Sequence, residues 1–395
     1  MQRRELFVWA SFFCGVFLSS SWFVASADSL RPNQIAAISL AARQAISQNH
    51  IPSVVVEVDR GGKRVFEGAW GQRNLAEQIP ANTRTLYQYG SITKQITAMG
   101  IFLLAQDGKL SLDDPIGKYL PAFAQKAISI RQVLIHTSGL ADFTNLPDYP
   151  LKIAPQLATG PEWGLNWAAS HLLDFPPGTK AQYSNTGYVV LARIIEKASG
   201  QPFEDFLQSR IFALANMRTA YLFQFFPTRQ NEAVGYLWWG KEIAAYMAAT
   251  PAQGAQVNHV VNAPFWNLRQ ADGAGLLVGD AKALQNWDDA LLAGKLLRGK
   301  WRALYFSSGV LNDGSPAYAG PENAMKVRPS YCYGGFGKMV IDGHTLYGAN
   351  GGTFGFTTFT AIVPDLHIAV TTLTNLGEVD NRKLTTPVLD ALLER

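Results

Sequence analysis

A serine and a lysine stand three residues apart in the segment Tyr89-Gly90-Ser91-Ile92-Thr93-Lys94-Gln95. Residues three apart on a helix are surface neighbours, so a helix that begins here would bring the Lys94 amine within reach of the Ser91 hydroxyl. A free serine is a weak nucleophile, and a nearby amine that can lose its proton is one way to activate it. Ser91 is also the only serine in the chain with a lysine three residues later. The pair is therefore a candidate nucleophile with its activating base.

About one such spacing is expected by chance in a chain of this length, and the simpler interpretation is a helix-capping serine beside a solvated lysine. The residues that follow favour the chemical interpretation, because Ile92, Ile96, Met99 and Leu103 recur at helical spacing before Gln106-Asp107-Gly108. This pattern predicts a helix over 91–106 that is buried on one side. Gly90 permits a sharp turn before it, and the unpaired N–H groups of its first turn would point at whatever lies over Ser91.

A second pair of candidate residues lies in Tyr183-Ser184-Asn185, which follows a Pro-Pro-Gly break and precedes an apolar helical run. Residues two apart in an extended loop point the same way, so the phenol and the amide would face one site. A tyrosine can take or give a proton if a neighbouring cation lowers its pKa, and Lys94 could be that cation. The alternative is a buried tyrosine and asparagine that satisfy the backbone of the loop.

The third segment is Tyr347-Gly348-Ala349-Asn350-Gly351-Gly352-Thr353-Phe354-Gly355-Phe356, which we expect between two strands. Its glycines would let the backbone approach a ligand closely. A backbone N–H at the strand edge could then form an oxyanion hole with that of Ser91. Taken alone, the segment is equally compatible with a glycine-rich hairpin that binds nothing.

The elements that would position these residues fall into two groups. Strand signals lie at the two ends of the chain, at 53–58, 64–69, 335–341, 344–348, 355–363 and 367–374. Helical patterns at 32–48 and 384–393 flank them. We expect the fold class α/β (α+β), with one antiparallel sheet built from residues 28–75 and 301–395 and the terminal helices packed against it.

Helical signals dominate residues 76–300, for example at 91–106, 130–136, 186–199, 203–211 and 280–293. We interpret this stretch as a mostly helical lobe inserted into a discontinuous α/β lobe, with the active site between the two. Residues 221–270 are rich in aromatic side chains. These could be core and covering loops, or an aromatic lid over a hydrophobic substrate pocket.

Residues 1–27 are typical of a secretory signal peptide, with a basic start, an apolar core over 6–18 and the small-x-small sequence Ala25-Ser26-Ala27. The apolar core is short for a membrane span, although further apolar residues leave an uncleaved anchor open. We therefore expect a periplasmic or secreted protein that is on the membrane only if the leader is retained. Only Cys332 would survive cleavage, so no intrachain disulfide is expected.

The composition and the motifs that are missing exclude several functions. The net charge is +4 without runs of like charge, which favours neither nucleic acid nor an anionic membrane as a partner. None of the six histidines has the spacing of a metal site, and we expect neither a metal nor another cofactor. Gly-x-Ser-x-Gly and phosphate-binding glycine loops are also missing, which argues against a Ser-His-Asp hydrolase and a nucleotide-binding protein.

Together, the three segments resemble those of the serine β-lactamase and penicillin-binding protein superfamily, which uses Ser-x-x-Lys. The chain is most similar to the class C β-lactamase-like branch, which also includes D-alanyl-D-alanine peptidases, D-aminopeptidases and esterases. The resemblance covers nearly all of the mature chain. Further matching segments are Gly108-Lys109-Leu110-Ser111-Leu112-Asp113-Asp114-Pro115, Leu134-Ile135-His136-Thr137-Ser138-Gly139-Leu140, Gly235-Tyr236 and Gly273-Ala274-Gly275-Leu276.

The resemblance implies a role for each candidate. Ser91 would be the acylated nucleophile, Lys94 its activating partner, and Tyr183 the general base and acid. Asn185 would contact Lys94 and the substrate, and the N–H groups of Ser91 and Gly352 would form the oxyanion hole. Ala349, Asn350, Gly351 and Gly352 would contact the substrate. His136 looks like a catalytic histidine, but its loop in this family implies a structural role.

Ala349 departs from the family pattern, in which the third motif begins with Lys or His, as in Lys-Thr-Gly or His-x-Gly. A cation there helps to hold the carboxylate of penicillins and peptides, so its loss removes a charge-assisted contact. We therefore expect an esterase before a β-lactamase, D-alanyl-D-alanine carboxypeptidase or D-aminopeptidase. The substrate would be a small ester, amide or peptide. A non-catalytic cell-wall sensor or binding domain is less favoured, because a pure binder does not need Ser91, Lys94 and Tyr183 together.

Overall fold

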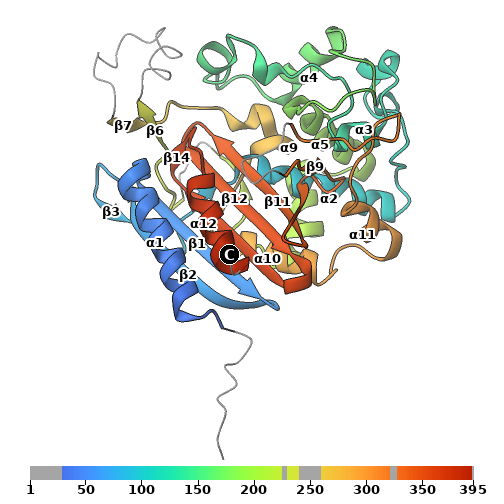
Figure 1. The fold of residues 1–395 in the computed structure, drawn as a ribbon. Helices are drawn as coiled ribbons and strands as arrows, with labels where there is room; N and C mark the ends of the chain where they lie inside the picture. The colour runs from blue at the N-terminus through green and yellow to red at the C-terminus, as the bar shows by residue number, and fades with distance from the viewer. Residues whose placement is uncertain (1–28, 225–228, 240–258, 321–326, 394–395) are drawn as a thin grey trace, which may run out of the picture.

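The computed structural model describes residues 29–224, 229–239, 259–320 and 327–393 (Figure 1). Its main sheet has eight strands in the order β3-β2-β1-β13-β12-β11-β10-β9, and all neighbouring strands are antiparallel. The strands are β1 (Ser53–Arg60), β2 (Lys63–Asn74), β3 (Ile79–Pro80), β9 (Ser330–Tyr331), β10 (Gly337–Ile341), β11 (His344–Thr353), β12 (Phe356–Val363) and β13 (Ile368–Thr374).

Strands from the two ends of the chain meet in the middle of this sheet, where β1 pairs with β13 from Val54↔Thr374 to Arg60↔Ile368. The terminal helices α1 (Pro32–Asn49) and α12 (Arg382–Leu393) lie next to each other over one face. The remaining helices lie on the opposite side of the sheet (Figure 1). The α/β (α+β) class with terminal helices and an inserted helical lobe is therefore confirmed.

The other α-helices in the described residues are α2 (Thr93–Gln106), α3 (Ile130–Leu134), α4 (Pro161–Ser170), α5 (Asn185–Ser199), α6 (Phe203–Leu207), α7 (Ala213–Ala215), α9 (Asp272–Gly275), α10 (Ala281–Leu292) and α11 (Gly299–Tyr305). Two small sheets complete the fold. One joins β4 (Tyr87–Gln88), β8 (Leu277–Gly279) and β5 (Tyr221–Leu222), and the other joins β14 (Leu376–Gly377), β6 (Tyr236–Trp239) and β7 (His259–Asn262).

The two faces of the main sheet are packed against different helices. Along β1, Val54, Val56 and Val58 belong to the core under α1 and α12, whereas Val55 belongs to the core of the helical lobe. Successive side chains of a strand point to opposite faces, so this alternation follows directly from strand geometry. Because helices cover both faces, β1 is buried along nearly its whole length and has the continuous β-branched sequence of a two-sided strand.

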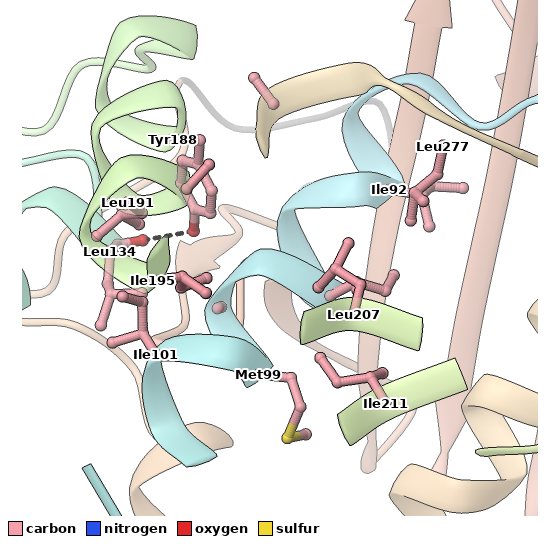
Figure 2. Close-up of a cluster of buried hydrophobic side chains, with 14 of the residues drawn as sticks. Ile92, Met99, Ile101, Leu134, Tyr188, Leu191, Ile195, Leu207, Ile211 and Leu277 are labelled. Carbon is pink, nitrogen blue, oxygen red and sulfur yellow. Dashed lines mark hydrogen bonds between the residues drawn. The ribbon is translucent and has the colours of Figure 1, made fainter. Parts of the chain in front are cut away.

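Helix α2 is the buried axis of the helical lobe. All its residues from Thr93 to Ala105 are buried, because α5, α6, α9 and α11 pack around it. Figure 2 shows side chains of this segment, including Met99 and Ile101, among apolar side chains of neighbouring elements. In the same cluster the Tyr188 hydroxyl donates a hydrogen bond of 2.9 Å to the Leu134 carbonyl. The sequence pattern indicated burial on one side of this helix, but the structure buries it all round.

The glycine-rich segment differs from the sequence prediction. We expected residues 347–356 to lie between two strands, but β11 continues through Ala349, Asn350, Gly351 and Gly352 to Thr353. These residues pair with β12 from Tyr347↔Ile362 to Thr353↔Phe356. Ladder hydrogen bonds therefore hold the segment in an extended conformation, and the turn to β12 is confined to Phe354 and Gly355.

Two sequence predictions fall partly or wholly outside the described residues. The proposed signal peptide of residues 1–27 lies outside them, as do Phe225, Phe226 and Tyr246 of the aromatic segment. Of its described aromatic residues, Tyr221, Tyr236 and Trp239 are core residues and Phe265 is exposed. No helix in the described part of the chain has the length and apolarity of a membrane span.

Candidate active site

Ser91 lies in the 3₁₀ turn η1 (Gly90–Ile92), which leads directly into α2. Gly90 has φ +55°, in the left-handed region that favours glycine. A Cβ placed on Gly90 would come within 2.6 Å of the Gly352 nitrogen, so the turn lies with its backbone against β11. The Thr358 hydroxyl adds a hydrogen bond of 2.9 Å to the Tyr89 carbonyl just before the turn. The serine is therefore fixed between a helix start and a strand.

Lys94 lies three residues further along the chain and is 2% exposed. Its Nζ is 3.1 Å from the Ser91 Oγ, 2.8 Å from the Asn185 Oδ1 and 2.8 Å from the Ala274 carbonyl oxygen. The amide and backbone oxygens can only accept, so two amine hydrogens are directed to them. In the neutral amine the third position is a lone pair, and it faces the Ser91 hydroxyl. This geometry suits an amine that takes the serine proton.

Burial makes the neutral form of Lys94 accessible near neutral pH. Loss of hydration disfavours the charged ammonium and lowers the pKa of Lys94 from 10.5 to about 7, while the Asp142 carboxylate acts in the opposite direction. A base is most effective when its pKa lies close to the working pH. The structure thus provides a base poised for neutral conditions.

Tyr183 approaches the same serine oxygen from another side, and its hydroxyl donates a hydrogen bond of 2.5 Å to the Ser91 Oγ. The Lys94 Nζ is 4.7 Å from the centre of the tyrosine ring. Although the residue is 38% exposed, burial around the hydroxyl raises its pKa, and the hydrogen bond to Ser91 only partly offsets this. The sequence suggested that Lys94 would lower this pKa. The pKa moves upward because the dominant effect is desolvation, so the resting tyrosine is a neutral phenol.

Asn185 is the first residue of α5 and is held on both sides of its amide. Its Oδ1 accepts from Lys94, and its Nδ2 donates to the Thr144 Oγ1 at 2.9 Å. The buried Asp142 carboxylate accepts from the Asn185 backbone N–H at 2.8 Å and from the Thr144 hydroxyl at 3.0 Å. A chain of hydrogen bonds therefore leads from Asp142 through Thr144 and Asn185 to the Lys94 amine.

Asp142 and Thr144 are residues that the sequence analysis missed. Asp142 occupies the N-cap of the short η4 turn (Phe143–Asn145), where it accepts from the Thr144 backbone N–H at 3.0 Å. An aspartate two residues before a threonine is a common capping pattern, so sequence alone assigns it to the turn. Its link to the site depends on a contact with α5 some forty residues later, which no local pattern shows.

His136 supports the tyrosine loop and does not contact Ser91. Its Nδ1 accepts from the Ser184 backbone N–H at 3.1 Å, so a neutral ring carries its proton on Nε2. The ring centre lies 4.6 Å from those of both Tyr183 and Tyr331. Burial and the nearby Lys94 hold the pKa of His136 well below its usual value. This environment agrees with the structural role that the family resemblance implies.

The β11 strand forms the opposite wall of the site, and its residues differ in the space around them and in their contacts. A Cβ on Gly351 would collide with the Tyr89 carbonyl oxygen, whereas one on Gly352 would meet no atom within 4 Å. The Asn350 Oδ1 accepts from the Asn381 Nδ2 at 2.9 Å, just before α12. Ala349 lines the pocket beside Ser91. The structure thus joins Ser91, Lys94, Tyr183 and Asn185 by hydrogen bonds and places the backbone of Gly351 and Gly352 against the turn that carries Ser91. The Asn350 side chain, in contrast, is bonded to Asn381.

The pocket at this site has a volume of about 260 Å³. Residues from several elements line it, namely Ser91, Lys94, His136, Tyr183, Ala319, Pro329, Tyr331, Gly335, Phe336, Gly337, Met339, Gly348, Ala349 and Asn350. A larger hollow of about 620 Å³ lies between α4, α5 and α9, but its described lining, which includes Arg193 and Asp272, contains no serine, threonine, cysteine or lysine. We therefore place the chemistry in the smaller pocket. Among the described residues, no cluster of His, Cys, Asp or Glu could hold a metal ion.

An antiparallel sheet with an inserted helical lobe, and a serine, lysine and tyrosine between them, defines the class of β-lactamase-like serine hydrolases. The chain belongs to this family, because the family model described as "Beta-lactamase" matches residues 38–393. Hydrolases of the family generally act through an acyl-enzyme on a serine.

Individual relatives support the same assignment. The chain is 28% identical over 314 residues to penicillin-binding protein 4* of Bacillus subtilis, covering 75% of this chain and 67% of the relative. It spans about half the length of several other curated relatives. Among solved structures, D-amino acid amidase from Ochrobactrum anthropi SV3 with L-phenylalanine amide is similar, with a TM-score of 0.76, 24% identity and coverage of 91% of this chain and 99% of that one.

A further similar structure is EstCE1, described as a hydrolase with promiscuous acyltransferase activity. Its TM-score is 0.72 at 20% identity, with coverage of 91% of this chain and 98% of that one. At these identities the structural similarities establish the fold. The activity of this chain has to be argued from its own residues.

The Asp142 network predicts a large effect on stability. In Asp142→Ala, the Asn185 N–H and the Thr144 N–H would lose their acceptor inside the protein, so we expect the free energy of unfolding to fall by about 3 kcal/mol. Urea unfolding followed by circular dichroism measures this change. Asp148→Ala is the control, since Asp148 forms an exposed ion pair with Lys152 and its loss should cost about 0.5 kcal/mol or less. Equal losses in the two variants would contradict the network.

Proposed function

We propose that this protein is a serine hydrolase that forms an acyl-enzyme on Ser91 and acts preferentially on neutral carboxylic esters. The observation that carries the proposal is the position of the Ser91 Oγ, which lies 3.1 Å from the Lys94 amine and 2.5 Å from the Tyr183 hydroxyl. A serine held between a base and a proton donor meets the geometric requirement for an activated nucleophile.

In the first step the neutral Lys94 amine takes the Ser91 proton as the serine oxygen attacks the carbonyl carbon. The raised pKa of Tyr183 and the lowered pKa of Lys94 favour the amine as the first acceptor. This assignment differs from the role of first base that the resemblance implied for Tyr183. The tyrosine keeps its proton and remains a donor at the reacting oxygen.

In the second step the tetrahedral intermediate collapses and the bond to the alcohol oxygen breaks. That oxygen receives a proton from Tyr183, and the proton held by Lys94 then passes to the Tyr183 oxygen. The net result is that the Ser91 proton leaves on the alcohol. Water then attacks the acyl carbon while the Lys94–Tyr183 pair takes one of its protons. The bond to the Ser91 oxygen breaks, and the pair gives that proton to Ser91 as the acid leaves.

Charge on the carbonyl oxygen would be stabilised by two backbone N–H groups, those of Ser91 and Gly352. The contact between Gly90 and the Gly352 nitrogen supports their proximity. The first N–H groups of a helix lack intrahelical partners, and fixed donors of this kind are effective at a developing oxyanion.

The preference for neutral esters rests on Ala349. At this position on the pocket wall, a lysine or histidine would supply a cation for a substrate carboxylate. Lys94, the only lysine or arginine among the described residues that line the pocket, already binds Ser91, Asn185 and Ala274. An anionic substrate would therefore lose hydration without gaining a charged partner.

The second candidate is an amidase or peptidase of the same family, acting on D-amino-acid amides, cell-wall peptides or β-lactams. The names of relatives, such as a penicillin-binding protein and a D-amino acid amidase, favour this alternative. A non-catalytic cell-wall sensor would not require the arrangement at Ser91. Export to the periplasm or the medium is part of the proposal and rests on the sequence of residues 1–27.

A hydrolysis panel on purified mature protein distinguishes the candidates. It includes short and long acyl p-nitrophenyl esters, a chromogenic cephalosporin, D-amino-acid amides and a D-alanyl-D-alanine peptide. We expect kcat/KM to be highest for a neutral ester. Preference for the cephalosporin or the D-alanyl peptide would contradict the proposal and favour the second candidate.

Restoring a cation at position 349 should change this order. We expect Ala349→Lys to raise kcat/KM on substrates with a carboxylate by about 10- to 150-fold, since one charge-assisted hydrogen bond contributes about 1.5–3 kcal/mol. Neutral esters of small alcohols should change little. Ala349→Met is the matched control, because it adds length without charge. An equal gain in both variants would show that charge is not the cause.

A further inference from the structure

The pocket beside Ser91 is lined partly by residues that take no part in the proton transfers. Part of the lining consists of the reacting groups Ser91, Lys94 and Tyr183. Two further polar side chains, those of His136 and Asn350, also line it. The rest comes from β10, β11 and the segments that precede them, and its side chains are apolar or aromatic: Ala319, Pro329, Tyr331, Phe336, Met339 and Ala349. This second part extends the pocket from the nucleophile towards the β9–β10 edge of the main sheet.

The position of Tyr183 identifies which half of a substrate lies there. Under the proposed function, Tyr183 protonates the departing oxygen, whereas the backbone of Ser91 and Gly352 holds the carbonyl oxygen. Tyr183 and Ser91 line the pocket, whereas Gly352, the second donor to the carbonyl oxygen, does not. The departing group is therefore on the side of the apolar wall, and the acyl group is on the other side of Ser91.

Among the described residues, the two cations next to this wall along the chain, Arg328 and Lys338, have other partners. Lys338, which precedes Met339 on β10, has its Nζ 6.0 Å from the centre of the Tyr347 ring. The Arg328 Nε donates to the Gly320 carbonyl at 2.9 Å, and its guanidinium lies 4.1 Å from the Tyr318 ring centre. His136 is held neutral by burial, as described above. The described wall thus favours an uncharged occupant.

We infer that this apolar wall is a leaving-group subsite for an uncharged, apolar alcohol. The inference rests on the proposed function. The pocket volume of about 260 Å³ sets the size of the occupant. Since a cavity of roughly 150 Å³ accommodates benzene, a benzyl group or a straight chain of about four to six carbons fits. Ala349 keeps this volume open, because a lysine or histidine side chain there would project into it.

The test separates the two halves of the ester. One series keeps a butyryl group and varies the alcohol through methanol, butanol, hexanol and benzyl alcohol, and a second series of methyl esters varies the acyl group. Acylation is the step in which the alcohol leaves, so the effect belongs in kcat/KM. We expect kcat/KM to rise about fourfold for each methylene that becomes buried, over the first four to six carbons of the alcohol. The same extensions of the acyl chain should give a smaller slope.

Variants at Met339 locate the subsite. Met339→Ala widens the pocket and should move the optimum to longer alcohols, whereas Met339→Trp should reduce kcat/KM on hexyl and benzyl esters by about tenfold or more relative to the methyl ester. Val340→Ala and Val340→Trp are the matched controls, because Val340 is the next residue on β10 and is 53% exposed. Fluorophosphonate labelling of Ser91 in each variant shows that the nucleophile is intact.

The outcomes also separate the subsite from the choice of ester. A series of butyramides with the corresponding amines is measured in parallel. Hydrolysis of the amides alone, with the same dependence on Met339, would contradict the ester preference and support the subsite. Ester hydrolysis with a flat dependence on the alcohol, or with equal effects of the Met339 and Val340 variants, would overturn the subsite and leave the proposed function standing. Preference for an anionic leaving group would also overturn it.

Discussion

Ser91→Ala is expected to lower kcat on a neutral ester by about 10⁶-fold, because a hydrolase that loses its nucleophile keeps only binding and oxyanion stabilisation. The Ser91 hydroxyl is hydrogen-bonded to both Lys94 and Tyr183. Ser91 is partly exposed, so the loss of one oxygen should leave the fold intact. Steady-state hydrolysis of a p-nitrophenyl ester measures the effect.

Ser170→Ala provides the control for this variant. Ser170 is an exposed serine on α4, and its hydroxyl bonds only to local groups at Trp167 and His171. It should keep the wild-type rate. A Ser91→Ala protein that still turns over the ester at more than about one hundredth of the wild-type rate would remove Ser91 from the chemistry.

The second large effect concerns Lys94 and Tyr183. Lys94→Met keeps the length of the side chain but removes the amine, and Tyr183→Phe removes only the hydroxyl. Each is expected to lower kcat by about 10³-fold or more, the upper range for a positioned acid or base. Because the two groups handle one proton in sequence, the double variant should be little worse than either single variant. Additive losses would show that the two residues act independently.

The pH dependence of kcat/KM gives an independent measure of the same pair. The pKa of Lys94 is about 7, and the neutral amine is the active form, so the wild-type rate should rise with pH through that value and level off above it. Below it the rate should fall about tenfold per pH unit. This limb should disappear in Lys94→Met. If it persists there unchanged, another group is responsible.

Much of this architecture could be predicted from the sequence because its signals are local. The strand signals at 53–58 and 64–69 predicted the neighbouring strands that the structure shows as β1 and β2. The motifs around Ser91 and Tyr183 could also be recognised from the sequence, and the match to the family model supports the family resemblance that they suggested. Ser91 lies in the turn just before α2 and Tyr183 lies just before α5, and local spacing can reveal such helix starts.

What the sequence could not show depends on contacts between distant segments. The direction of the Tyr183 pKa follows from how deeply its hydroxyl is buried, which no spacing reveals. The link from Asp142 to Asn185 and the apolar wall at Met339 likewise arise only when separate elements meet. The strand character of Ala349–Gly352 was missed because glycine is depleted in strands, whereas pairing with β12 overrides that tendency.

The central claim is that Ser91 becomes covalently acylated, and mass spectrometry of the trapped enzyme tests it most directly. The protein is incubated with a fluorophosphonate or with a slow ester, digested, and the modified peptide is sequenced. We expect one stoichiometric adduct on Ser91, slowed in Lys94→Met and lost in Ser91→Ala. An adduct on another residue, or rapid ester hydrolysis with Ser91 unmodified by either reagent, would contradict the mechanism.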